Sequence, residues 1–156
     1  MTELLAWIEG SAIATWTRES PSIWAYPTIL ALHTMGLGVV VGANAVVDFR
    51  LLGYGRRIPL PSLAPLYRLV WWAFALNAAT GVLLFMSEAT TKAKQPVFYI
   101  KLTLIALALW NATLTRRVVV AKPLKAPETS RARRLAFVSL TLWTATIVAG
   151  RLMAYL

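Results

Sequence analysis

His33 is the only histidine of the chain, and it is the side chain with the widest choice of chemistry. It lies inside a long apolar stretch, where an imidazole can be an axial ligand of haem iron, relay a proton or contact a quinone. The alternative is a neutral imidazole that is hydrogen-bonded to a neighbouring helix. A haem b between membrane helices usually has two axial ligands, so it would need Met86, Met153 or the same histidine of a second copy as partner.

Ionisable side chains from other apolar stretches are expected close to His33. Glu88 follows the second stretch, Lys101 lies early in the third and Arg151 lies late in the fourth. Together with Tyr26 they predict a ligand- or cofactor-binding pocket in the outer half of a membrane. Glu88 and Lys101 are expected to form an ion pair, because a partner offsets the free energy of burying either charge. In the competing interpretation Lys101 and Arg151 extend to the lipid headgroups.

Other polar side chains within the apolar stretches are expected to face the interior of a helix bundle, because exposing an amide or a carboxyl to lipid is unfavourable. In the first stretch such residues share one helical face with His33. Asp48 is expected to pair with Arg50, Arg116 or Arg117 at the end of that helix. The predicted polar interior consists of Asn44, Asp48, Asn77 and Asn111.

Sequence templates of known catalytic sites are absent. The chain has no GxSxG, HExxH, Walker-type or Gly-rich dinucleotide motif, and a lone histidine does not make a catalytic triad. Cysteine is absent too, which excludes thiolate catalysis, disulfides and thiolate metal sites. The sequence therefore does not predict an enzyme.

The composition indicates that a lipid bilayer surrounds these residues. Of the 156 residues, 58% are hydrophobic and 14% are charged, against about 25% charged in soluble domains. A net charge of +10 would suggest nucleic acid in a soluble domain, but the basic residues lie in the connections between apolar stretches. There they set the orientation and attract anionic lipid headgroups, so nucleic acid is not expected as a partner.

Four apolar stretches are long enough to span a bilayer as α-helices, given about 20 residues for each. They predict an all-α polytopic membrane protein, a four-helix bundle whose transmembrane domain covers residues 23–156. The expected spans are about 23–47, 66–87, 96–115 and 135–156, the first capped by Ser20 or Ser22. Residues 1–22 are too polar to span and predict an amphipathic helix in the interface, over about 2–17.

The distribution of Lys and Arg predicts the orientation, because connections rich in these residues stay inside. Eleven of the sixteen lie in the first–second and third–fourth connections. Both termini are therefore expected outside, in the periplasm of a bacterium whose inner membrane holds the protein. On the first helix, the spacing Gly38-x-x-x-Gly42 predicts close packing against a helix of this chain or of a second protomer.

Short motifs along the chain resemble a family of small, uncharacterised bacterial inner-membrane proteins that are distantly like the membrane domain of copper-resistance protein D. They are Tyr26-Pro27, His33-Thr34-Met35-Gly36, Gly42, Asp48 to Gly53, Thr80-Gly81, Leu84-Phe85, Gln95 to Phe98, Lys101 and Asn111. The resemblance implies a four-helix inner-membrane bundle and assigns no activity. Thr115-Arg116-Arg117 stands where relatives often have a second histidine, which argues against a two-histidine metal or haem site.

Two functions follow from these features. The first is a non-enzymatic membrane component that associates with itself or with a larger complex through the face of Gly38 and Gly42. The alternative is a b-type cytochrome-like protein, or one that binds a quinone or a lipid, in which His33 contacts the ligand.

Overall fold

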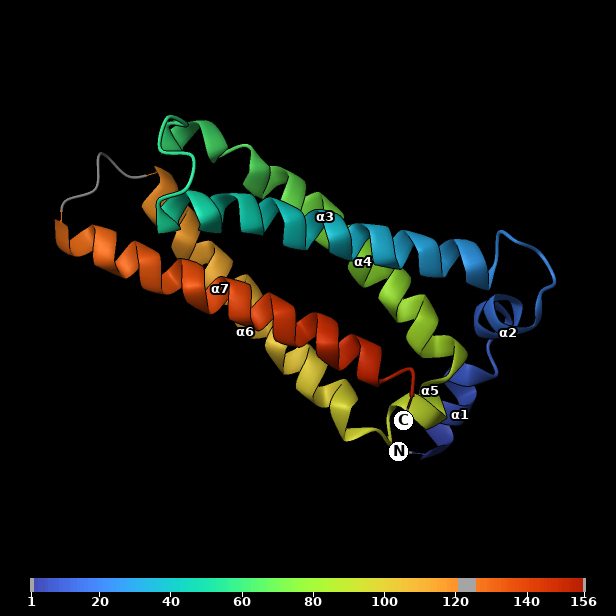
Figure 1. The fold of residues 1–156 in the computed structure, drawn as a ribbon. Helices are drawn as coiled ribbons and strands as arrows, with labels where there is room; N and C mark the ends of the chain where they lie inside the picture. The colour runs from blue at the N-terminus through green and yellow to red at the C-terminus, as the bar shows by residue number, and fades with distance from the viewer. Residues whose placement is uncertain (1, 121–125, 156) are drawn as a thin grey trace.

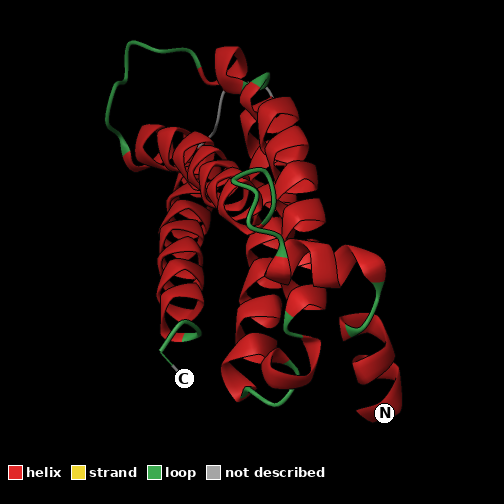
Figure 2. Cartoon of the chain, turned by 90° about the vertical axis from the view of Figure 1, so that its right-hand side faces the viewer, coloured by secondary structure: helices red, strands yellow, loops and turns green. Residues whose placement is uncertain are grey.

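The computed structural model describes residues 2–120 and 126–155, with side chains at 2–120 and 130–155, and every regular element in those ranges is a helix. In chain order the elements are α1 (Thr2–Glu9), α2 (Ala12–Glu19), α3 (Tyr26–Leu52), the 3-10 turn η1 (Leu60–Leu63), α4 (Leu66–Ser87), α5 (Ala89–Lys92), α6 (Pro96–Val120) and α7 (Ala126–Leu152). Figure 2 shows this all-helical chain.

Four helices, α3, α4, α6 and α7, are long and apolar enough to cross a membrane. Their 22 to 27 residues correspond to about 33 to 40 Å at the rise of an α-helix, more than the hydrocarbon core of about 30 Å. The prediction of an all-α protein with four helices of bilayer length is confirmed.

The long helices form two antiparallel pairs. α3 packs along α4, α6 packs along α7, and α3 also packs along α7, whereas α4 and α6 make few contacts with each other. Figure 1 shows the two pairs diverging toward the end that holds both termini and the short helices α1, α2 and α5. Because α4 and α6 barely touch, the space between the two pairs is filled incompletely.

Three of the four spans differ from the predicted ranges. α3 continues five residues further than expected and ends at Gly53, whose φ of 111° is left-handed, followed by Gly55 with φ of 59°. Its first residue is Tyr26, with Pro27 in the first turn, and the predicted caps Ser20 and Ser22 instead accept hydrogen bonds from loop amides. The second span agrees with the prediction.

α6 and α7 are also longer than the apolar stretches that predicted them. α6 ends at Val120 and α7 begins at Ala126, so both helices extend into the strongly basic connection. An Arg or Lys side chain ends the apolar stretch that fits the hydrocarbon core. It does not end the helix, since Arg and Lys are good helix formers. The expected end of the last span at 156 is also wrong, because α7 ends at Leu152.

The N-terminal segment forms two helices instead of the single one predicted over 2–17. α1 ends before Gly10, and Ser11 caps α2 by accepting a hydrogen bond from the amide of Ala14 at 3.4 Å. Glycine and serine favour this break because Gly is a poor helix former and Ser competes for backbone donors. Ala14 and Thr17 are buried, whereas Trp7 and Trp16 are exposed.

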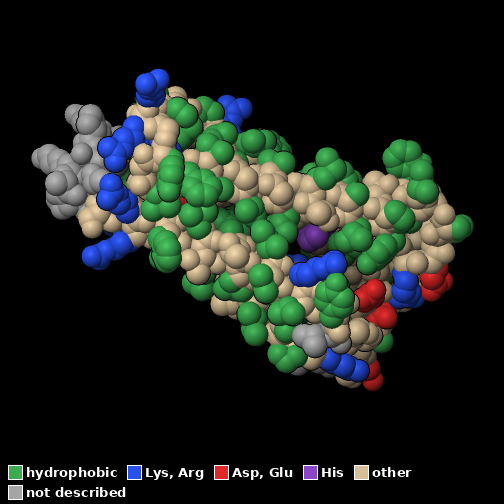
Figure 3. All heavy atoms as spheres, viewed as in Figure 1, with side chains coloured by type: hydrophobic (Ala, Val, Ile, Leu, Met, Phe, Trp, Pro, Cys, Tyr) green, Lys and Arg blue, Asp and Glu red, His purple; other side chains and the backbone are tan. Residues whose placement is uncertain are grey.

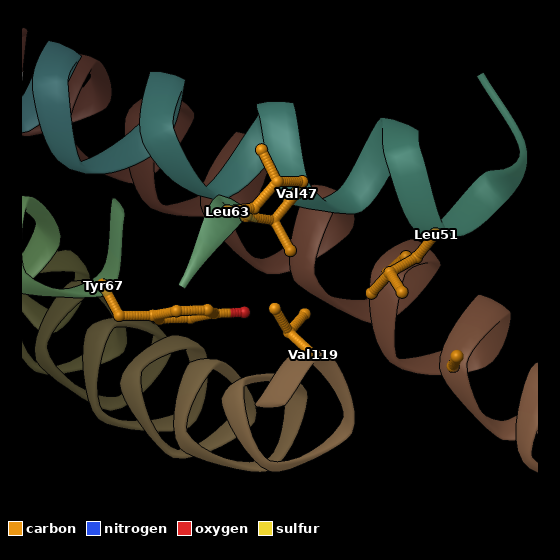
Figure 4. Close-up of a cluster of buried hydrophobic side chains, with 7 residues drawn as sticks. Val47, Leu51, Leu63, Tyr67 and Val119 are labelled. Atoms are coloured by element: carbon orange, nitrogen blue, oxygen red, sulfur yellow. The ribbon is translucent and has the colours of Figure 1, made fainter. Parts of the chain in front are cut away.

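The bundle core at the end away from the termini is a cluster around Tyr67. Val47 and Leu51 of α3, Leu63 of η1 and Val119 of α6 belong to it, and Figure 4 shows the Tyr67 hydroxyl pointing toward Val119. A second cluster, which includes Val40, Val70 and Trp143, lies further along the bundle. These side chains hold the two helix pairs together at the basic end.

Candidate functional site

A cavity of about 490 Å³ lies between the two helix pairs, in the half of the bundle that contains the termini. Its walls are mainly apolar and come from α3, α4, α6 and the end of α7. Four of the predicted site residues line it, namely Tyr26, His33, Glu88 and Lys101. In Figure 3 the imidazole, coloured purple, is visible in a hollow beside a basic side chain. The volume is that of a small-molecule pocket.

The imidazole of His33 is held by the facing helix α4. Its Nδ1 lies 2.9 Å from the backbone oxygen of Asn77 and 3.2 Å from Oγ1 of Thr80. A carbonyl oxygen can only accept, so Nδ1 carries the hydrogen and donates it. In the neutral imidazole Nε2 is then an acceptor, and within the described residues it has no hydrogen-bond partner.

Asn77 and Gly81 fix the position of this ring. The Asn77 amide donates to the backbone oxygen of His33 at 2.6 Å, so the two residues bind each other's main chain. A Cβ atom added to Gly81 would lie 3.0 Å from Cε1 of His33. The glycine is therefore part of the site, because a larger residue would press on a ring that two hydrogen bonds hold.

The charges around the cavity are arranged differently from the prediction. Glu88 pairs with Lys92, one helical turn away, at 3.3 Å, and not with Lys101. Lys101 lies near Gly150, where an added Cβ would be 3.6 Å from its Nζ. Among the described residues Lys101 has no carboxylate within 4 Å. A helix-spaced partner satisfies Glu88 without the cross-bundle contact that the sequence suggested.

Arg151 does not line the cavity, contrary to the prediction. Its guanidinium is exposed and lies over the ring of Tyr155, 5.1 Å from the centroid. Of the two methionines considered as haem ligands, Met153 lines the cavity and Met86 does not. Two lining residues were not predicted as site residues: Lys92, at the end of α5, and Phe98, in the first turn of α6. Their only signal was their position in or next to the connection between the second and third apolar stretches.

All four residues of the predicted polar interior are buried; Asn77 lines the cavity beside His33, and Asn44, Asp48 and Asn111 lie in the other half of the bundle. Asn44 donates to its own helix, and Asn111 donates to Leu135 of α7 at 3.0 Å. The prediction of an arginine pair for Asp48 is wrong. Arg50 donates to the backbone oxygens of Ile58 and Arg56, and no described Arg or Lys lies within 4 Å of the Asp48 carboxylate.

Asp48 is instead surrounded by helices and is 1% exposed. Its Oδ2, the Ser139 hydroxyl and the Tyr67 hydroxyl are buried and have no hydrogen-bond partner within the part of the chain that the structure describes. Buried polar groups normally have partners, and one left without costs about 1 to 3 kcal/mol. These three groups give the basic half of the bundle a polar interior, but none of them lines the cavity of His33.

Close helix contacts occur at glycines other than those predicted. Around Gly38 and Gly42 an added Cβ would meet nothing within 4 Å, so in the part of the chain that the structure describes these residues pack against no other helix. Gly36 is the close-approach position of α3, since an added Cβ would lie 3.3 Å from Ala73 and Asn77 of α4. The face of Gly38 and Gly42 is left on the outside of the bundle.

The N-terminal helices are bound to the rim of the cavity. The backbone amide and hydroxyl of Thr90 both donate to Oε2 of Glu9, and Arg18 donates to the backbone oxygen of Ser87 at 3.0 Å. The Thr90 hydroxyl, then its backbone amide, lower the pKa of Glu9, because both hydrogen bonds favour the charged carboxylate. Arg18 lies 3.6 Å from the same carboxylate.

Comparisons with protein-family models, with curated proteins and with solved structures find no match to this chain.

Proposed function

We propose that this protein binds a ring-shaped amphipathic ligand of the quinone class in the cavity that His33 lines. The observation that carries the proposal is the His33 imidazole, whose Nδ1 is bound to α4 and whose Nε2 is left as an acceptor at a mostly apolar cavity of about 490 Å³. Ligand pockets are typically apolar spaces of this size with a few oriented polar groups.

The polar groups match the two oxidation states of a quinone. The ring carbonyl of a quinone accepts hydrogen bonds, and the Lys101 ammonium is a donor on the cavity wall. The hydroxyl of a quinol donates, and Nε2 of His33 is the acceptor. The isoprenoid or alkyl tail would lie along the apolar walls, where Phe74 and Ile105 are found.

Titration of the purified protein with a decyl-substituted benzoquinone tests this function. We expect saturable binding that His33→Ala weakens about tenfold, because one hydrogen bond in a buried site contributes about 1 to 2 kcal/mol. Met35→Ala is the matched control, since Met35 is on the same helix and 66% exposed. Equal affinities of the three proteins, or no saturable binding, would overturn the proposal.

An absorption spectrum separates the quinone from haem b. Met153 lines the same cavity as His33, so a haem with these two axial ligands is the competing occupant. A Soret band in protein from haem-replete cells that disappears in both His33→Ala and Met153→Ala would replace the quinone by haem. A colourless preparation that binds the quinone supports the proposal.

We propose that the protein resides in a bacterial inner membrane with both termini outside, as a member of the family that its motifs resemble. The excess of Lys and Arg at one end supports this orientation. In this orientation α1 and α2 lie at the outer interface, where the exposed Leu4, Trp7, Ile13 and Trp16 would meet headgroups and acyl chains.

Self-association is a second candidate function, and the uncovered face of Gly38 and Gly42 favours it. Small residues let two membrane helices approach closely, and no helix of this chain occupies that face. Native mass spectrometry in mild detergent tests it: a dimer that Gly38→Leu with Gly42→Leu converts to monomer supports self-association. A monomeric wild-type protein at all concentrations argues against it.

A further inference from the structure

A second cavity, of about 470 Å³, lies between α4 and α6 in the basic half of the bundle. It is separate from the cavity of His33, since no residue lines both. It occurs where the two helix pairs leave a gap, because α4 and α6 make few contacts. In a bilayer, such a gap between two spanning helices opens sideways to lipid.

One face of α6 forms a wall of this groove. Leu109, Ala112, Thr113, Arg116, Arg117 and Val120 all line it, and their spacing of three and four residues is that of a single helical face. α4 supplies the opposite wall with Tyr67, Val70 and Trp71, again at helical spacing. The groove is thus a continuous surface along both helices.

Polarity changes along the groove. One end is apolar at Leu109 and Val70, and the end toward the last turn of α6 carries the exposed guanidinium groups of Arg116 and Arg117. Leu109 and Arg116 are seven residues apart, about 10 Å along the helix. The length of α6 exceeds the thickness of the hydrocarbon core by up to about two helical turns. Its last turns therefore reach the level of the lipid headgroups.

We propose that this groove is a binding site for an anionic phospholipid. Arg116 and Arg117 bind the headgroup phosphate, since guanidinium groups match phosphate in charge and geometry. One acyl chain lies between α4 and α6 against Leu109 and Val70, and Trp71 lies beside it. The occupant is a lipid and not a free anion because the groove also presents the apolar side chains of Val70, Leu109 and Ala112, which a free anion would leave unused.

Native mass spectrometry with a mixture of phosphatidylglycerol and phosphatidylcholine of identical acyl chains tests the site. We expect one phosphatidylglycerol to be retained preferentially, and Arg116→Gln with Arg117→Gln to reduce its retention at least tenfold. Arg133→Gln with Arg134→Gln is the matched control: it removes the same charge from the same end of the molecule at two exposed residues. The control should retain the lipid like the wild type.

Three outcomes would overturn the site. These are no preference for phosphatidylglycerol over phosphatidylcholine, an equal loss in both double variants, and displacement of the lipid by excess inorganic phosphate. No preference would mean that the groove does not recognise an anionic headgroup, and an equal loss in both double variants would reduce the interaction to general attraction between a basic protein end and anionic lipid. Thermal unfolding of each variant in the same detergent verifies folding, and unchanged quinone titration of the Arg116/Arg117 variant separates this site from the function proposed for His33.

Discussion

The orientation of His33 depends on a residue that has no side chain. The ring donates from Nδ1 to α4 and passes over Gly81, so the space that the glycine leaves determines where Nε2 lies. Sequence reasoning selected His33 because a single imidazole at membrane depth is unusual. It had no means to show which nitrogen is committed to structure, because that depends on the register between α3 and α4.

Gly81→Ala is expected to disturb the site, whereas Gly38→Ala is not. The added Cβ at Gly81 would lie 3.0 Å from Cε1 of His33, and the ring cannot move without lengthening its hydrogen bonds to Asn77 and Thr80. We expect weaker quinone binding, by about tenfold, and a loss of about 1 to 3 kcal/mol in stability. At Gly38 the Cβ meets nothing within 4 Å, so Ala should be neutral or stabilising by up to about 1 kcal/mol. Thermal unfolding and ligand titration of both variants measure the difference, and identical behaviour would contradict it.

The carboxyl group of Asp48 is buried, and no described cationic side chain offsets the free energy of burying its charge. Among the described residues its Oδ2 has no hydrogen-bond partner, and neither do the nearby buried hydroxyls of Ser139 and Tyr67. Asp48→Asn keeps the shape and removes the charge, so we expect it to stabilise the protein by about 1 to 3 kcal/mol. Glu3→Gln, at an exposed carboxylate of α1 that has no ion pair among the described residues, should leave stability unchanged. Unfolding in detergent compares the two variants, and a destabilised Asp48→Asn protein would contradict an uncompensated charge at this position.

At the scale of elements, the short helices connect to the long ones through a few polar contacts. Glu9 accepts two hydrogen bonds from Thr90, and these join the end of α1 to α5 at the rim of the cavity of His33. The hydrogen bonds lower the pKa of Glu9 from its ordinary value of 4.5. The folded state therefore gains stability from the charged carboxylate above about pH 4.5, and this gain is lost as the pH falls through the lowered pKa.

Acid is consequently expected to release α1 from α5 before the long helices unfold. Amide hydrogen exchange of residues 2–9, followed from neutral pH to below pH 4, should show protection that is lost in the acid range. Glu9→Gln should lose the protection at neutral pH as well, whereas Glu3→Gln, at an exposed residue of the same helix, should behave like the wild type. Protection that is independent of pH in the wild type would contradict the role of Glu9.

The sequence predicted the elements better than their contacts. Apolar length predicted four long helices, because the bilayer requires about 20 apolar residues for each span. It did not predict the ends of α3, α6 and α7, since helical hydrogen bonding continues past the apolar stretch. The Glu88–Lys101 pair failed because Lys92, one turn from Glu88, is a nearer partner, and the short α5 that presents it has no apolar pattern.

At the scale of the molecule, charge is distributed unequally between the two ends. Figure 3 shows basic side chains at the end away from the termini and most of the acidic ones in view at the other end. Eleven of the sixteen Lys and Arg residues lie in the two connections at the basic end. If the four long, apolar helices all span the bilayer, both termini share one side, and the positive-inside rule supports the proposal that this side is the exterior.

Alkaline phosphatase fusions test this orientation, because the enzyme acquires its disulfides and its activity only outside the cytoplasm. A fusion after Leu156 should be active, and an insertion at Gly55, in the turn between α3 and η1, should be inactive. The reverse pattern would invert the molecule and put the phospholipid groove in the outer leaflet, with His33 toward the cytoplasm. Because the cavity of His33 and the groove of Arg116 lie in opposite halves of the bundle, one pair of fusions decides from which leaflet each ligand is reached. The expected pattern allows a quinone to enter from the outer leaflet while an anionic phospholipid occupies the inner one.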